Sequence, residues 1–303
     1  MHISLILCNF IAREITQTIK ENECAMKRIL FAIFAIAVLC GCEKENESNF
    51  EDAYLPQDPQ ITFTTNKEVG ETIVLRFIRD KVPTEVIGAI KIGEEEKDAD
   101  GGILEAFVVD ITYKITSQTV VLKGDIPCLR CSDNELTSLD ITQYPGLKLL
   151  QCDNNQLITF VVGENSELGF LSCDNNQLTQ LDVSKSLNLN VLFCNSNKLT
   201  SLDVSKNTEL GELGCANNKL MSLDLSRNTK LYNLGCYLNE IKSGEMSKII
   251  NALSDWTGET IWYVGEYPLK YATINVISKN SDESNEISDA DKKFAEEKNW
   301  KFR

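Results

Sequence analysis

The chain has 303 residues, 43% hydrophobic and 25% charged, so it carries enough apolar material for one large folded domain or two ordinary ones. The 30 lysines and arginines face 45 acidic residues, and the net charge of -15 would repel a phosphate backbone, which excludes nucleic acid as an expected partner. The one histidine, His2, lies upstream of a segment that we expect to be removed. A mature protein without imidazole excludes Ser-His-Asp and Cys-His catalysis and histidine-based metal sites.

The first predicted element is an export signal. The basic residues of 26–28 precede an apolar run over 29–39, which is too short for a permanent membrane span and is typical of a cleaved signal peptide. The end of this run resembles the bacterial lipobox, which implies that Cys42 receives a lipid. Cys40 departs from that pattern, because alanine, serine or threonine is usual there, and an ordinary signal peptide cut near Gly41 is the alternative.

The N-terminal part divides accordingly. Residues 1–25 precede a complete signal peptide with its own Met26, so we interpret them as an upstream start assigned in error. Residues 26–41 are the signal peptide, and residues 42–53 form an acidic tether with few apolar side chains on which to fold. Acidic residues after a lipidated cysteine resemble the surface-export signal of Bacteroidetes lipoproteins. This resemblance implies an outer-membrane lipoprotein exposed at the cell surface, with periplasmic retention as the alternative.

Residues 54–125 are predicted to form a small antiparallel β unit. Apolar and polar residues alternate with the period of a strand, and an acidic turn is expected over 93–102. The alternating segments are 60–64, 72–77, 107–113 and 119–122. Because the end of a repeat stack exposes its core, we expect this unit to cover it.

An internal repeat follows, and its cysteines are spaced by 21 residues. Leucine or isoleucine stands five residues before, two residues before and five residues after each cysteine, and asparagine stands three residues after it. The cysteines are Cys131, Cys152, Cys173, Cys194, Cys215 and Cys236. The pattern L-x-x-L-x-C-x-x-N-x-L resembles the leucine-rich repeat and covers six units over residues 126–243. Its L-D-[VIL]-[ST] tail resembles Bacteroidetes surface lipoproteins and, more distantly, the internalins.

The repeat predicts an α/β solenoid with a parallel sheet, in which the units stack because none can bury its own apolar side. The asparagines are expected to form a hydrogen-bonded ladder, and the tail Asp and Ser residues to stabilise turns, with a calcium row as the alternative. Equivalent cysteines on stacked strands lie too far apart for disulfides and in a line unsuited to zinc, so we interpret them as small core residues. Cys128 faces away from this core and is the one candidate reactive thiol.

Residues 244–303 are predicted to form a C-terminal α/β cap. Ser243 is expected to cap a helix that extends to about residue 254 with one apolar face. Strands are expected around 260–264 and 273–277, followed by a helix that Ser288 opens.

The candidate site is the concave face of the sheet, where residues beside the core leucines and cysteines are expected to face solvent. Large apolar side chains on a solvated sheet face are typical of binding surfaces. The predicted ligand-binding residues are Leu149, Gln151, Phe170, Ser172, Val191, Phe193, Glu212 and Tyr237.

These features predict a non-enzymatic, lipid-anchored cell-surface protein that binds a protein or glycan ligand, acts as a monomer and uses no cofactor, metal or catalytic residue. One alternative is an architectural lipoprotein of the envelope. The other is a glycan-processing enzyme, in which Glu212 would act with Asp174 or Asp153 as paired carboxylates. The family resemblance implies adhesion or interaction roles but does not identify the ligand.

Overall fold

The computed structural model of the protein describes residues 59–97, 108–257, 272–276 and 285–302, together with the backbone of 261–262 and 268–269. The chain divides into two units, Met1–Pro56 and Gln57–Arg303. The predicted upstream start, signal peptide, lipidated Cys42 and acidic tether all lie outside the described residues.

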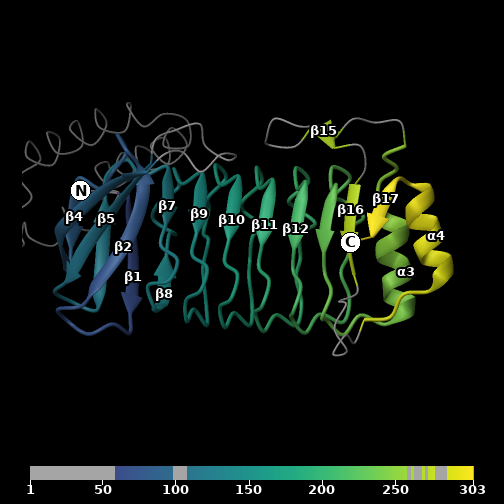
Figure 1. The fold of residues 1–303 in the computed structure, drawn as a ribbon, viewed down its shortest axis with the longest axis horizontal. Coiled ribbons are helices and arrows are strands. Elements are labelled where there is room, and N and C mark those ends of the chain that lie inside the picture. Colours follow the sequence, from purple (N-terminus) through teal and green to yellow (C-terminus); the bar gives the residue numbers. More distant parts are fainter. Residues whose placement is uncertain are drawn as a thin grey trace, which may run out of the picture. The chain divides into compact units, whose positions relative to one another are not determined.

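A parallel sheet passes through the repeats, and each unit contributes one short strand to it (Figure 1). Neighbouring strands pair without a shift in register, so that Leu171 lies between Leu150 and Leu192. The strands are β7 (Cys128–Arg130), β9 (Leu149–Gln151), β10 (Phe170–Ser172), β11 (Val191–Phe193), β12 (Glu212–Gly214) and β13 (Asn233–Gly235). The predicted leucine-rich repeat solenoid with a parallel sheet is confirmed.

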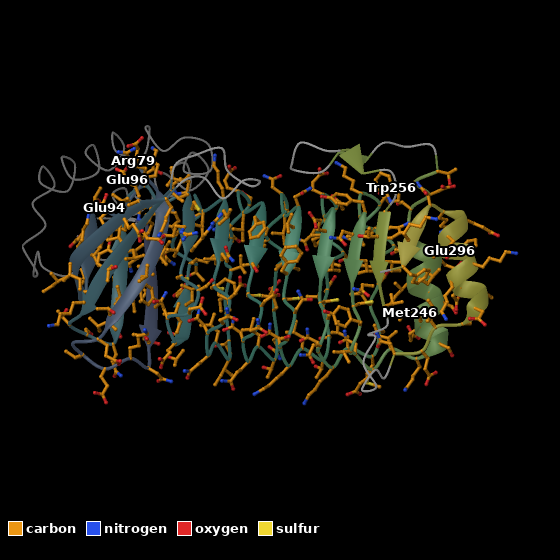
Figure 2. All side chains as sticks on the ribbon, viewed as in Figure 1. Arg79, Glu94, Glu96, Met246, Trp256 and Glu296 are labelled. Atoms are coloured by element: carbon orange, nitrogen blue, oxygen red, sulfur yellow. The ribbon has the colours of Figure 1, made fainter. Side chains whose placement is uncertain are left out.

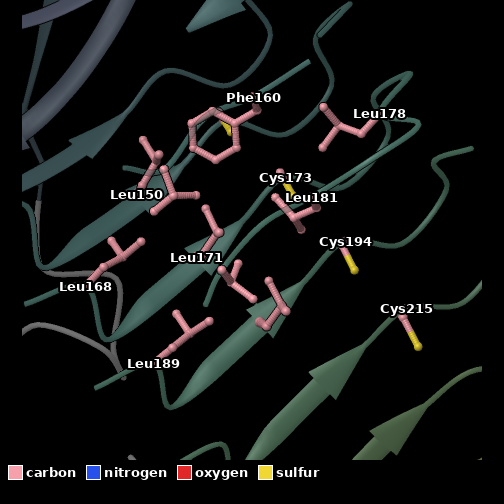
Figure 3. Packing of buried hydrophobic residues seen from close by; sticks show 14 of the residues in the cluster. Leu150, Phe160, Leu168, Leu171, Cys173, Leu178, Leu181, Leu189, Cys194 and Cys215 are labelled. Carbon is pink, nitrogen blue, oxygen red and sulfur yellow. The ribbon is translucent and has the colours of Figure 1, made fainter. Parts of the chain in front are cut away.

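Leucine and cysteine side chains fill the interior of the stack. Figure 3 shows Leu150 and Leu171 beside one another in this interior, with the cysteines following from turn to turn. Leu171 and Cys173 are both 0% exposed, as are their equivalents in the neighbouring units. The apolar side chains of each unit are therefore shielded from solvent by the units stacked on either side of it.

The predicted asparagine ladder is confirmed. Asn155 Oδ1 accepts hydrogen bonds from the backbone N–H groups of Asn134 (3.1 Å) and Leu136 (2.9 Å), while its Nδ2 donates to the carbonyl oxygens of Cys131 (3.1 Å) and Cys152 (3.0 Å). From Asn155 onward, each ladder asparagine joins its own turn to the preceding one, whereas Asn134 bonds to the backbone of Val74. The residue before each ladder asparagine adopts a left-handed backbone, φ +54° at Asn154, which asparagine tolerates better than most residues.

The predicted β unit that precedes the repeats, observed over residues 60–123, extends both sides of the solenoid. Strands β2 (Thr72–Ile78), β5 (Val108–Ile115) and β4 (Ala89–Lys97) join the parallel sheet through β7. Together with two C-terminal strands given below, they bring the sheet to 11 strands in the described part of the chain. Strands β3 (Glu85–Ile87), β6 (Thr119–Lys123), β1 (Gln60–Thr65) and β8 (Leu136–Asp140) form a separate 4-stranded sheet. Because β8 belongs to the first repeat, this unit covers the end of the leucine core on two sides.

The acidic turn expected over 93–102 is wrong for its first half. Residues 93–97 continue β4, which pairs with β5, and residues 98–102 lie outside the described residues. Glu94 and Glu96 are exposed on this edge strand, and Arg79 forms an ion pair with Glu96 (2.5 Å; Figure 2). Charged side chains are a common feature of edge strands, so the acidic composition reflects exposure rather than a turn.

In its described residues, the C-terminal segment adds two helices and four strands. These elements are α3 (Ser243–Ala252), β14 (Ile261–Trp262), β15 (Pro268–Leu269), β16 (Ala272–Asn275), α4 (Asp289–Glu297) and β17 (Trp300–Phe302). Helix α3 buries Met246, Ile249 and Ile250, as its pattern predicts. Lys242 rather than Ser243 occupies its N-cap position and makes no side-chain cap, whereas Ser288 caps α4 by accepting from the Asp291 N–H (3.1 Å).

Strand β16 continues the repeat as a seventh, irregular turn. It pairs with β13 in parallel, and Ile274 takes the place of the core leucine. Asn285 replaces the ladder asparagine, since its Oδ1 accepts from the Ile241 N–H (3.0 Å) and its Nδ2 donates to the Cys236 carbonyl (2.8 Å). The sheet face on which ligand binding is predicted therefore extends beyond the six regular repeats.

Candidate functional site

The face of the parallel sheet opposite the leucine core, here called the outer sheet face, consists of three rows of side chains. Strand register aligns the first two rows, and the third follows the strands directly. The first row contains Cys128, Leu149, Phe170, Val191, Glu212, Asn233 and Thr273. The second row contains Arg130, Gln151, Ser172, Phe193, Gly214, Gly235 and Asn275. The third row contains Ser132, Asp153, Asp174, Asn195, Ala216 and Tyr237.

All eight predicted ligand-binding residues lie on the outer sheet face, but half of them are buried. Gln151, Phe170, Phe193 and Tyr237 are partly exposed. Leu149, Ser172, Glu212 and Val191 are 2%, 3%, 5% and 8% exposed, so the expectation that they face solvent is wrong. Stacked strands are only about 4.8 Å apart, and side chains in one row consequently cover one another.

The two phenylalanines form the most prominent apolar feature of the face. The rings of Phe170 and Phe193 meet edge to face, with centroids 6.0 Å apart and planes at 86°. A Cβ atom at Gly214 would lie 2.9 Å from Phe193 Cδ1 and 2.7 Å from Asn195 Nδ2. The absence of a side chain at Gly214 therefore leaves the space that the Phe193 ring occupies.

The carboxylates of the third row link successive turns. Asp153 Oδ1 accepts hydrogen bonds from Ser172 Oγ (2.6 Å) and the Asp174 N–H (2.9 Å). Asp174 Oδ1 accepts in turn from the Asn195 N–H (2.6 Å). Burial raises the pKa of Asp174, and the hydrogen bonds from Asn195 oppose this shift. This row is a second ladder, which the sequence analysis missed.

The Glu212 carboxylate accepts hydrogen bonds from two uncharged side chains. The Tyr232 hydroxyl donates to Oε1 (3.1 Å) and Asn233 Nδ2 donates to Oε2 (2.7 Å). Thr273 Oγ1 donates to Asn233 Oδ1 (2.7 Å), which extends the chain of bonds into β16. Glu212, Asp174 and Asp153, the carboxylates considered for glycan processing, thus each accept hydrogen bonds from a neighbouring turn.

The seven cysteines in the described part of the chain are buried, and the sulfur atoms of Cys173, Cys194 and Cys215 follow the stack (Figure 3). No disulfide involves Cys128, Cys131, Cys152, Cys173, Cys194 or Cys215. Burial raises the pKa of Cys173 and Cys194 well above the ordinary thiol value. Cys128 is 1% exposed and its burial raises its pKa to about 11, so the expectation of a reactive thiol at this position is wrong.

Among the described residues, two hollows open on the outer sheet face. One of about 180 Å³ lies beside Phe193 and reaches Tyr237 and Asn275. The other, of about 420 Å³, lies where β2 meets β7. At the larger hollow, Arg76 donates to Asp110 through Nε (2.6 Å) and Nη2 (3.0 Å). Both hollows depend on strands outside the regular repeats.

Within the described residues, no group of three or more His, Cys, Asp or Glu side chains is arranged to hold a metal ion. The same part of the chain contains no helix with the length and apolar character needed to cross a membrane.

Comparisons with known proteins find similarity at the level of solved structures. No protein-family model matches the sequence, and no curated protein matches it. A leucine-rich repeat protein of Leptospira interrogans is 22% identical with a TM-score of 0.39, covering 56% of this chain and 46% of that one. The functional domain of InlJ from Listeria monocytogenes, described as including a cysteine ladder, is 20% identical with a TM-score of 0.29 and coverages of 61% and 50%. The chain spans about half the length of these two structures.

Proposed function

We propose that the protein is a non-enzymatic, lipid-anchored cell-surface protein that binds a protein or glycan ligand on its outer sheet face as a monomer. The observation that carries the proposal is the partly exposed edge-to-face pair of Phe170 and Phe193. Aromatic side chains contribute a large share of the energy at binding surfaces, and few other large apolar groups remain accessible on this face. The stacked leucine core and two ladders support a rigid surface, which limits the entropy lost on binding.

The double substitution Phe170→Ala with Phe193→Ala tests the proposed binding face. Ligands are identified by screening the purified full chain on a glycan array and by pull-down, and each hit is then titrated by calorimetry. We expect affinity to fall by about 2 kcal/mol, or about 30-fold, because truncating an aromatic anchor that the ligand covers removes its contacts with the ligand.

The matched control is Thr200→Ala, since Thr200 is exposed on a turn away from this face. It should bind within about twofold of the original chain. Circular dichroism checks that both variants fold. A folded double variant with undiminished affinity for every hit would place the site elsewhere.

Lipid attachment at Cys42 is the second part of the proposal, and it would place the protein at the outer membrane with its body exposed at the cell surface. Mass spectrometry of the mature N-terminus should find a diacylglyceryl-modified Cys42, and Cys42→Ala should accumulate as uncleaved precursor. Protease treatment of intact cells should digest the acylated protein. A mature terminus at an unmodified residue contradicts the anchor, and protection from the protease contradicts surface exposure.

A further inference from the structure

The hollow beside Phe193 has a composition unlike the rest of this acidic protein. Its second-row floor is Gly214 and Gly235, bounded by Phe193 at one end and Asn275 at the other. Three strand intervals of about 4.8 Å make this span about 14 Å. Among the lining residues that the structure describes, none carries a charged side chain, although the chain has a net charge of -15.

The space above Gly235 in the hollow is open. Neither crowding nor backbone conformation requires glycine at this position. A Cβ atom built there meets no described atom within 4 Å, and the residue is not in the left-handed region. Glycine inside a strand costs stability, and such a position often marks the close approach of a ligand. Gly214 differs, because the Phe193 ring and Asn195 occupy the space above it.

The walls combine aromatic surface with neutral hydrogen-bonding groups. Phe193 and Tyr237 are partly exposed rings, and Asn275 contributes a side-chain amide. The amides of Asn195 and Asn233 also line the hollow, where they already donate to Asp174 (3.0 Å) and Glu212 (2.7 Å) and keep their second N–H for a ligand. Amides both donate and accept hydrogen bonds, as the hydroxyl groups of a sugar do, while the apolar C–H face of a sugar ring packs on an aromatic surface. A volume of about 180 Å³ is below that of sites for drug-sized ligands and suits a single ring.

We propose that this hollow is a subsite for one uncharged sugar ring of a glycan. The inference rests on the proposed function and specifies its ligand class. The lack of charge among the described lining residues favours a neutral sugar over an acidic sugar or a charged peptide side chain. Phe193 joins the subsite to the exposed aromatic pair, so a longer glycan can continue across Phe170.

Gly235→Leu is the direct test, since its side chain would fill the hollow from the floor. The full chain is first screened on an array that carries neutral and sialylated or sulfated glycans, and the strongest neutral oligosaccharide is titrated by calorimetry. We expect Gly235→Leu to weaken its binding at least tenfold. Gly244→Leu is the matched control, because Gly244 lies in α3 and a Cβ there also meets no described atom within 4 Å. This control should bind within twofold of the original chain.

Asn275→Ala is a second variant, at the end of the hollow away from Phe193. It tests the sugar subsite if Gly235→Leu does not fold. It should weaken the same oligosaccharide at least fivefold. Recognition of acidic glycans alone, or equal binding by folded Gly235→Leu and Asn275→Ala, overturns the subsite. A protein ligand lost on Phe170→Ala with Phe193→Ala but retained by Gly235→Leu also overturns the subsite, while leaving the proposed binding face intact.

Discussion

Leu171→Ala should lower the free energy of unfolding by about 2–5 kcal/mol, the range measured when a buried leucine is truncated in a close-packed core. Leu171 is 0% exposed and lies between Leu150 and Leu192 on the neighbouring strands. Its removal leaves a void that the flanking units cannot fill, because their own backbone ladders fix their positions. Urea denaturation followed by circular dichroism measures the change.

Thr179→Ala is the matched control in the same repeat, since Thr179 is exposed on the turn after the ladder asparagine. It should change stability by less than about 0.5 kcal/mol. A loss below about 1 kcal/mol in Leu171→Ala would mean that the stack relaxes around the void, and that packing between units is looser than the structure indicates.

The repeat made the fold predictable because its information is local and periodic. A fixed interval of 21 residues places every core leucine, cysteine and ladder asparagine at an equivalent point, so the register of one unit applies to all. The pairing of Leu171 with Leu150 and Leu192 and the bonds of Asn155 follow from this spacing. The apolar face of α3 was predictable for the same reason, since its helical period is also local.

Exposure on the outer sheet face was less predictable because it depends on neighbours that alternation does not identify. Alternation correctly separates Val191 from the core residue Leu192, yet Val191 is only 8% exposed. Glu212 is buried by contacts with Tyr232 and Asn233, which lie in the next unit. Alternation gives the side of a strand on which a residue lies, whereas the neighbouring rows determine how much of it solvent reaches.

The hollow beside Phe193 could not be predicted because the sequence indicates a strand over 273–277 but not its parallel pairing with β13, through which β16 forms one wall. The sequence does contain a sign of this extra turn, because Ile274-x-Val276 repeats the Leu-x-Cys spacing of the units. The ladder residue Asn285, however, stands nine residues after Val276, whereas in each regular unit the asparagine stands three residues after the cysteine. An insertion between the strand and its ladder residue conceals a turn from a search at fixed spacing. The hollow where β2 meets β7 was not predictable either, because β2 lies outside the repeats and its antiparallel pairing of Arg76 with Arg130 follows no fixed spacing.

Asn176→Ala should destabilise the protein by about 1–3 kcal/mol through lost hydrogen bonds rather than lost volume. Asn176 is 7% exposed, its Oδ1 accepts from the Leu157 N–H (3.1 Å), and its Nδ2 donates to the carbonyl oxygens of Cys152 (3.0 Å) and Cys173 (3.1 Å). Alanine withdraws the side-chain partner from these three backbone groups and from the Asp174 carbonyl (3.2 Å), and a buried group left unsatisfied costs about 1–3 kcal/mol.

Asn188→Ala is the matched control, because Asn188 is an exposed asparagine on the turn that precedes the next strand. Urea denaturation should show a change below about 0.5 kcal/mol for this control. Asn176→Asp separates the two halves of the interaction, since it keeps the acceptor for Leu157 and loses the donor to Cys152 and Cys173. If Asn176→Ala were as stable as the control, backbone pairing and leucine packing alone would hold neighbouring turns together, and the ladder would contribute only to the shape of each turn.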